Sequence, residues 1–144
     1  MKQQDYNCSI TANVTAKEAA KGISRVSEWW AKNFEGKAEK LNDVFTVRFG
    51  ETFVTFKLTE VVADKKIVWH VTDCYLPWLN NKTEWKDTQV VWEISEENNL
   101  TQIDFTHIGL VPGIECYGIC IKGWDQHVKG SLSKLLTENR GMPE

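Results

Sequence analysis

The chain has 144 residues, of which 26% are charged, and a formal net charge of −3 at pH 7. This length suits a single domain over residues 1–144, with enough chain to bury a core without metals or disulfides. Scattered lysines on an acidic chain disfavour nucleic-acid binding, and no apolar run is long enough for a membrane span. The polar N-terminal residues lack the apolar core of a signal peptide, which predicts a cytoplasmic protein.

The four cysteines, Cys8, Cys74, Cys116 and Cys120, include no Cys-x-x-Cys pair. In a cytoplasmic chain we expect them to be reduced thiols. Cys116, Cys120 and His127 fall on one stripe of a predicted helix, which raises the idea of a zinc site, but their spacing fits no standard ligand motif. We therefore expect no metal and no cofactor.

The first elements follow from alternation and capping. Apolar and polar residues alternate over Tyr6–Val14, which predicts a half-buried strand. Thr15 and Glu18 have the spacing of a capping box, which indicates a short helix running to about Ile23. Ser24 then suits the N-cap of a second short helix.

Three strand runs follow, at residues 44–49, 52–62 and 66–73. A tight turn at Gly50-Glu51 pairs Phe45 with Phe56 and Val47 with Val54. All four side chains then share one face, as a hairpin with one buried side requires.

The inner face of the third run is ambiguous, because apolar residues occupy both sides of the strand. Ile67, Trp69 and Val71 compete with Val68 and His70, and a bulge would decide between the two faces.

Residues 74–86 predict a long loop, with a further irregular strand left open around Leu76. Its two tryptophans, Trp78 and Trp85, suit a lid over a pocket, a partner contact, or rings folded back onto the body of the domain.

Strands over 88–94 and 100–110 and a long helix over 115–139 complete the chain. Apolar positions recur at helical spacing along that helix. Its internal glycines cost about 1 kcal/mol each relative to Ala. They are Gly118, Gly123 and Gly130. Either a close backbone approach or a kink would account for them.

This order of elements predicts an α+β fold. A curved antiparallel sheet with one apolar face must bury that face, and the C-terminal helix is the element long enough to cover it.

The same order resembles the helix-grip fold of the START and Bet v-like superfamily. Within it, the chain is most similar to the branch of homologues of the activator of the heat-shock-protein-90 ATPase. Three stretches carry the resemblance, and each matches in order and spacing. They are Ile10–Trp30, Thr101–Leu110 with its Thr-His-x-Gly ending, and Gly123–Leu135. The resemblance implies an apolar cavity between the sheet and the long helix.

Eight residues are candidates for lining that cavity, because each lies on an inward row of a strand or on the inner side of the helix. They are Phe45, Phe56, Trp92, Phe105, His107, Tyr117, Cys120 and Trp124. The competing interpretation is that the aromatic rings fill a solid core.

Three functions remain open at this stage. The first is the binding of a small apolar or amphipathic molecule in the cavity. The second is an interaction protein, either a chaperone cofactor or a homodimer, with an exposed apolar patch. The third is a cyclase or hydrolase in which His107 and Tyr117 act as acid–base groups on one pocket.

Overall fold

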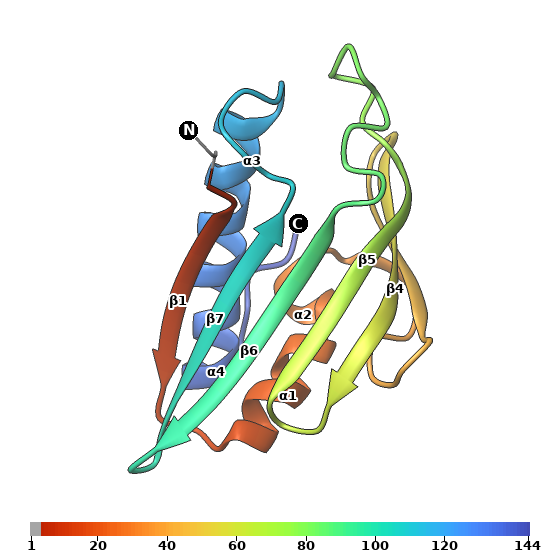
Figure 1. Cartoon of the computed structure of the whole chain (residues 1–144). Helices are drawn as coiled ribbons and strands as arrows, with labels where there is room; N and C mark the ends of the chain where they lie inside the picture. The colour runs from red at the N-terminus through yellow and green to blue at the C-terminus, as the bar shows by residue number, and fades with distance from the viewer. Residues whose placement is uncertain (1–3) are drawn as a thin grey trace.

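The computed structural model describes residues 4–144, so the first residues of the polar N-terminus, on which the signal-peptide prediction depends, lie outside the described residues. The strands and helices, shown in Figure 1, are β1 (Tyr6–Ala12), α1 (Ala16–Ser24), α2 (Val26–Trp29), β2 (Asn33–Gly36), β3 (Val44–Phe49), β4 (Thr52–Val62), β5 (Lys66–Tyr75), β6 (Gln89–Glu97), β7 (Leu100–Ile108), α3 (Tyr117–Trp124), a π-helical segment η1 (Asp125–Leu132) and α4 (Ser133–Glu138).

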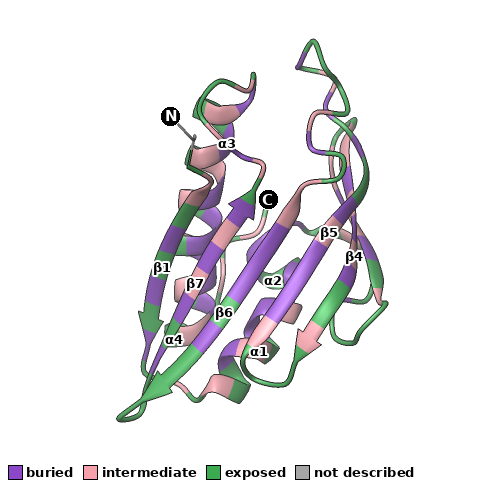
Figure 2. Cartoon of the chain, viewed as in Figure 1, coloured by how far each residue is buried: buried purple, intermediate pink, exposed green. Residues whose placement is uncertain are grey.

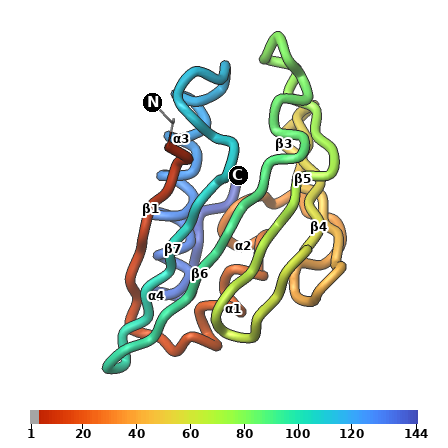
Figure 3. The backbone as a smooth tube through the Cα atoms, in the orientation of Figure 1, coloured from red at the N-terminus to blue at the C-terminus, as the bar shows by residue number. Residues whose placement is uncertain are grey.

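The strands form one antiparallel sheet in the order β1-β7-β6-β5-β4-β3-β2. The sheet is curved, and the helices lie on one of its faces (Figures 1 and 3). The predicted α+β helix-grip arrangement is therefore confirmed. Among residues 4–144, no helix combines the length and hydropathy that crossing a bilayer requires.

The predicted hairpin has the expected register. Phe45 pairs with Phe56 and Val47 pairs with Val54 across β3 and β4. All four side chains are buried, because a two-residue turn and a period of two leave one way to put them on the same face.

Two register shifts between β4 and β5 resolve the ambiguous third run. They fall between Thr55 and Phe56 and between Leu58 and Glu60. Bulges of this kind increase local twist and re-aim side chains, and Trp69 and Val71 both become fully buried.

The sequence left one further strand open around Leu76. The additional strand is instead β2, which directly follows the short helices. β2 is a four-residue edge strand that pairs with β3 alone, Asn33 lying opposite Arg48 and Gly36 opposite Phe45. Its sequence has no apolar alternation to reveal it, because three of its four residues are exposed.

One of the two predicted helix caps is present. The Thr15 hydroxyl accepts a hydrogen bond from the Glu18 backbone N–H at 3.1 Å, as an N-cap should. Ser24 does not cap the second helix: it ends α1, and its hydroxyl donates to the Lys21 carbonyl. Arg25 occupies the N-cap of α2 without a side-chain hydrogen bond.

The C-terminal helix begins at Tyr117 and ends at Glu138, with π-helical geometry in its middle. A Cβ added at Gly118, Gly123 or Gly130 would meet no heavy atom within 4 Å. The sheet therefore does not approach the helix backbone closely at these glycines, and the distorted stretch 125–132 contains one of them, Gly130.

Aromatic rings fill the space between the sheet and the helices. Figure 2 shows buried positions alternating with exposed ones along β1 and β7. The largest fully buried rings are Trp29, Trp69, Trp92, Phe45, Phe56 and Phe105. Their centroids lie 4.8 to 5.7 Å apart at the Phe45–Phe56, Trp69–Trp92, Trp92–Phe105 and Trp29–Trp92 contacts, so this part of the interior is solid core.

Candidate ligand pocket

An apolar pocket of about 240 Å³ lies at one end of the sheet. The start of the C-terminal helix and the 76–88 loop project from the same end of the sheet in Figure 1, and both contribute lining residues. The residues that line it are Trp30, Phe49, Thr52, Val54, Leu76, Trp78, Trp85, Ile119, Cys120, Gly123, Trp124, His127 and Glu144. The pocket therefore forms where five separate segments of the chain converge.

Four tryptophans dominate the lining. The Trp124 ring lies 4.8 Å from the ring of Trp30 and 5.9 Å from that of Trp85, with which it is stacked. These three rings are buried, whereas Trp78 is 46% exposed at the mouth. Three rings thus form a fixed wall, and the fourth is open to solvent.

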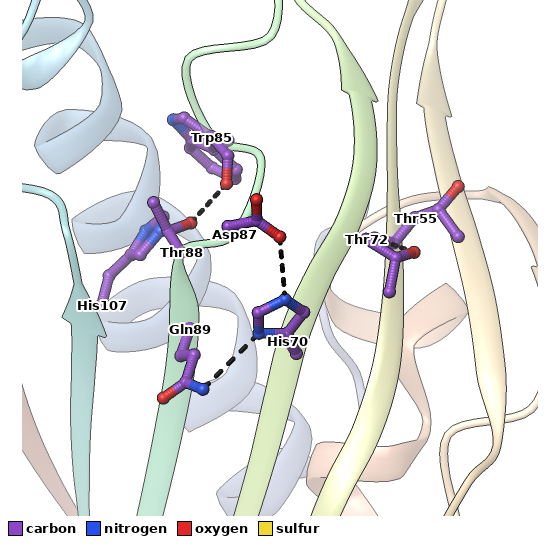
Figure 4. A network of polar contacts seen from close by, with 8 residues as sticks. All are labelled: Thr55, His70, Thr72, Trp85, Asp87, Thr88, Gln89 and His107. Carbon is purple, nitrogen blue, oxygen red and sulfur yellow. Dashed lines mark hydrogen bonds and ion pairs between the residues drawn. The ribbon is translucent and has the colours of Figure 1, made fainter.

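A buried histidine, His107, is linked by hydrogen bonds to two of these tryptophans, and Figure 4 shows Thr88 between it and Trp85. The Trp124 indole N–H donates to His107 Nδ1 at 3.0 Å. The Thr88 hydroxyl donates to the Trp85 carbonyl at 2.7 Å, so its oxygen is left to accept from His107 Nε2 at 2.9 Å. His107 is therefore the neutral tautomer with its proton on Nε2.

The environment of His107 does not suit an acid–base role. Its side chain is fully buried, and burial lowers its pKa to about 3. Both ring nitrogens are occupied by protein partners. Neither His107 nor the half-buried Tyr117 is among the described residues that line the pocket, so the two do not converge on a substrate site.

Two carboxylates connect the 76–88 loop to the start of the C-terminal helix. Glu84 of the loop accepts hydrogen bonds from the backbone N–H groups of Glu115 and Cys116, at 2.9 and 3.1 Å. Glu115 in turn accepts from the backbone N–H of Asn80 at 2.8 Å. The two bonds to Glu84 satisfy donors at a helix start that lack partners within the helix. We call this reciprocal arrangement of Glu84 and Glu115 the latch.

The cysteines differ from expectation. Cys116 and Cys120 form a disulfide, whereas Cys8 and Cys74 are free and buried. The prediction of four reduced thiols is therefore wrong for one pair. The two cysteines can bond because one helical turn brings their Cα atoms to 5.6 Å, within the range that a disulfide spans. Trp85 donates its indole N–H to Cys116 Sγ at 3.1 Å.

The zinc idea has no structural support, since no cluster of potential metal ligands occurs within residues 4–144.

The polar end of the pocket is built by the chain's last residues. Glu144 pairs with Trp30 and Lys32 through backbone hydrogen bonds of 2.9 and 2.8 Å. Its carboxylate accepts from the Gln126 amide at 2.8 Å and lies 3.5 Å from Nε2 of the buried His127. Burial lowers the pKa of His127, an effect that the nearby Glu144 charge partly opposes. His127 is therefore neutral at pH 7.

The eight candidate residues separate into three groups. Cys120 and Trp124 line the pocket. His107 does not line the pocket but accepts a hydrogen bond from Trp124, which does. Tyr117 is outside the lining and packs half-buried against the core. The remaining four rings belong to the solid core and do not line the pocket. They are Phe45, Phe56, Trp92 and Phe105.

Sequence reasoning missed several lining residues. Trp30, Phe49 and Glu144 gave no signal as pocket residues, because their positions depend on the docking of distant segments. Trp78 and Trp85 did give one, since the loop that carries them was recognised as a candidate lid.

Fold and pocket together define the class: a helix-grip domain with a small apolar pocket at one end of the sheet. No protein-family model and no curated protein matches the sequence. Solved structures do match. A chain of the Aha1 dimer from Colwellia psychrerythraea superimposes with a TM-score of 0.76 at 17% identity, covering 96% of this chain and 99% of that chain.

Two further structures show the same arrangement. DynU16, from the dynemicin biosynthetic locus, has a TM-score of 0.72 at 14% identity, and covers 94% of this chain but 48% of its own. The protein MLL2253 from Mesorhizobium loti has a TM-score of 0.70 at 13% identity, covering 91% of this chain and 96% of its own. At such identities the similarity establishes the fold alone, a curved antiparallel sheet wrapped around a C-terminal helix.

Proposed function

We propose that the protein binds a small apolar or amphipathic molecule in the tryptophan-lined pocket. The observation that carries this proposal is a pocket of about 240 Å³ walled by four indole rings. An apolar cavity of about 150 Å³ holds benzene, and sites for drug-sized ligands begin near 300 Å³. The pocket therefore suits a ligand of one ring with a short substituent, or a compact two-ring molecule.

Gly123 provides a direct test, because it lines the pocket and a Cβ built there has open space around it. The variant Gly123→Leu should fill the pocket without clashing with the backbone. We expect the wild type to bind a neutral naphthylamine dye with 1:1 stoichiometry, measured by isothermal titration calorimetry. We expect Gly123→Leu to lose at least ten-fold in affinity.

The matched control is Gly118→Leu, which adds the same side chain to the same helix at an exposed position outside the pocket. It should bind the dye like the wild type. Equal binding by the Gly123 and Gly118 variants would place the dye elsewhere, and a wild type that binds no apolar probe would refute the proposal. Native mass spectrometry of freshly purified protein, with organic extraction, would identify any ligand that co-purifies.

A second candidate function is self-association through the mouth of the pocket. Ile119 and Trp78 both line the pocket and are 65% and 46% exposed. The fold neighbour with a TM-score of 0.76 is described as a dimer. An exposed apolar pair of this kind is typical of a contact surface.

The variant Ile119→Asp tests this second candidate. We expect it to shift a concentration-dependent dimer to monomer in sedimentation-velocity experiments. Leu41→Asp is the matched control, since Leu41 is 54% exposed and outside the pocket. A wild type that sediments as a monomer at all concentrations would exclude self-association.

A further inference from the structure

The charge of the residues that line the pocket is negative. Of the described residues that line it, none is Lys or Arg, and Glu144 supplies a carboxylate. His127, the other titratable side chain with polar atoms there, is buried and neutral at pH 7. The lining therefore has a formal charge of −1, on a chain whose own net charge is −3. This field opposes an anion and favours a cation.

The tryptophan rings that line the pocket also favour a cation. The face of an indole carries negative charge from its π-electrons and attracts a cation within about 6 Å, more strongly than a Tyr or Phe ring. Trp30, Trp85 and Trp124 are held against one another by ring contacts of 4.8 and 5.9 Å, so no large rearrangement is needed to present them. Trp78 adds a fourth ring at the mouth.

We propose that the ligand is an organic cation, a protonated or quaternary amine attached to an apolar ring or short chain. This inference rests on the proposed function and adds the chemistry of the head group. The apolar body occupies the space beside the tryptophans, and the ammonium group lies between the indole faces and the Glu144 carboxylate. A carboxylate ligand is disfavoured, because it would lose its hydration without gaining a cationic partner.

Three probes of similar size separate charge from hydrophobicity: 2-phenylethylammonium, 2-phenylethanol and phenylacetate. Titration calorimetry at pH 7 and low ionic strength should give an affinity for the ammonium probe roughly 5- to 30-fold above that for the alcohol. Phenylacetate should bind more weakly than the alcohol.

Two variants test which groups supply the preference. Glu144→Gln removes the carboxylate charge from the lining, and should lower the affinity for the ammonium probe about three-fold or more relative to its affinity for the alcohol. Trp78→Leu removes one ring face from the lining, and should lower the affinity for the ammonium probe more than that for the alcohol. Glu138→Gln removes a carboxylate from the far end of the helix, outside the pocket, and should change neither affinity.

The outcomes distinguish the two proposals. If the alcohol binds as tightly as the ammonium, or phenylacetate binds tightest, the cation inference is overturned and the apolar pocket function stands. If none of the three probes binds, and the naphthylamine dye also fails, both are overturned.

Discussion

His107 should make the folded protein sensitive to acid in a way that one substitution removes. Its pKa in the folded state is lowered to about 3 by burial, whereas an unfolded histidine titrates near 6.5. Between these values the unfolded chain binds up to one more proton than the folded chain. The free energy of unfolding therefore falls as the pH drops from about 6.5 towards 3, by up to about 1.4 kcal/mol per pH unit.

The substitution His107→Phe should lower stability at neutral pH and remove a source of instability at acid pH. At pH 7.5 it leaves the buried Trp124 indole N–H without an acceptor, which costs about 1–3 kcal/mol, so the variant should be less stable than the wild type. At pH 4.5 the wild type has lost roughly 2–3 kcal/mol through His107 and the variant has not. The difference in stability between the two should therefore shrink by about that amount.

Urea unfolding followed by far-UV circular dichroism at several pH values measures this difference. Carboxylates that titrate in the same range affect both proteins equally and cancel. The control Thr88→Val breaks the same hydrogen-bond chain but leaves the imidazole buried, so it should lose stability yet keep the pH slope of the wild type. A difference between His107→Phe and wild type that does not change with pH would refute the reasoning.

Three other predictions concern the helix and its attachments. Glu84→Gln weakens one half of the latch by about 1 kcal/mol, and the Cys116 amide that it binds should exchange its hydrogen about five-fold faster in NMR exchange measurements. Gly118→Ala should raise stability by about 0.5–1 kcal/mol, whereas Gly141→Ala, whose Cβ would lie 2.1 Å from a backbone carbonyl oxygen of α2, should lower it by about 1–3 kcal/mol, both in thermal melts. Cys120→Ser should cost about 2 kcal/mol through loss of a short cross-link, and a reductant should then change only the wild-type melting temperature.

The sheet could be predicted from the sequence wherever local pattern and turn geometry agree. The β3–β4 register followed from a two-residue turn and four apolar residues at period two. The inward row of β7 followed from the same alternation, and Thr101, Ile103, Phe105 and His107 are all buried. β2 could not be predicted, because Asn and Gly are poor strand formers and their pairing is imposed by β3.

The pocket was harder to predict, because its walls depend on contacts between residues far apart in the chain. Whether Trp85 is buried while Trp78 is exposed depends on the latch, whose partners are separated by 31 to 35 residues. The inward-facing aromatic rows pointed correctly to the space beneath the sheet. They could not show that Trp29 and Trp69 already fill most of it.

The tryptophans described above also give the molecule an optical property. Six of the seven lie in one network of ring contacts, with neighbouring centroids 4.8 to 6.5 Å apart, whereas Trp78 stands at the pocket mouth, 46% exposed. Rings this close together can exchange absorbed light before emission, and buried rings emit at shorter wavelength than exposed ones. Trp78 is exposed enough for a water-soluble quencher to reach it directly. We expect quenching of the unlabelled protein to act first on Trp78, so that it reports on the pocket mouth.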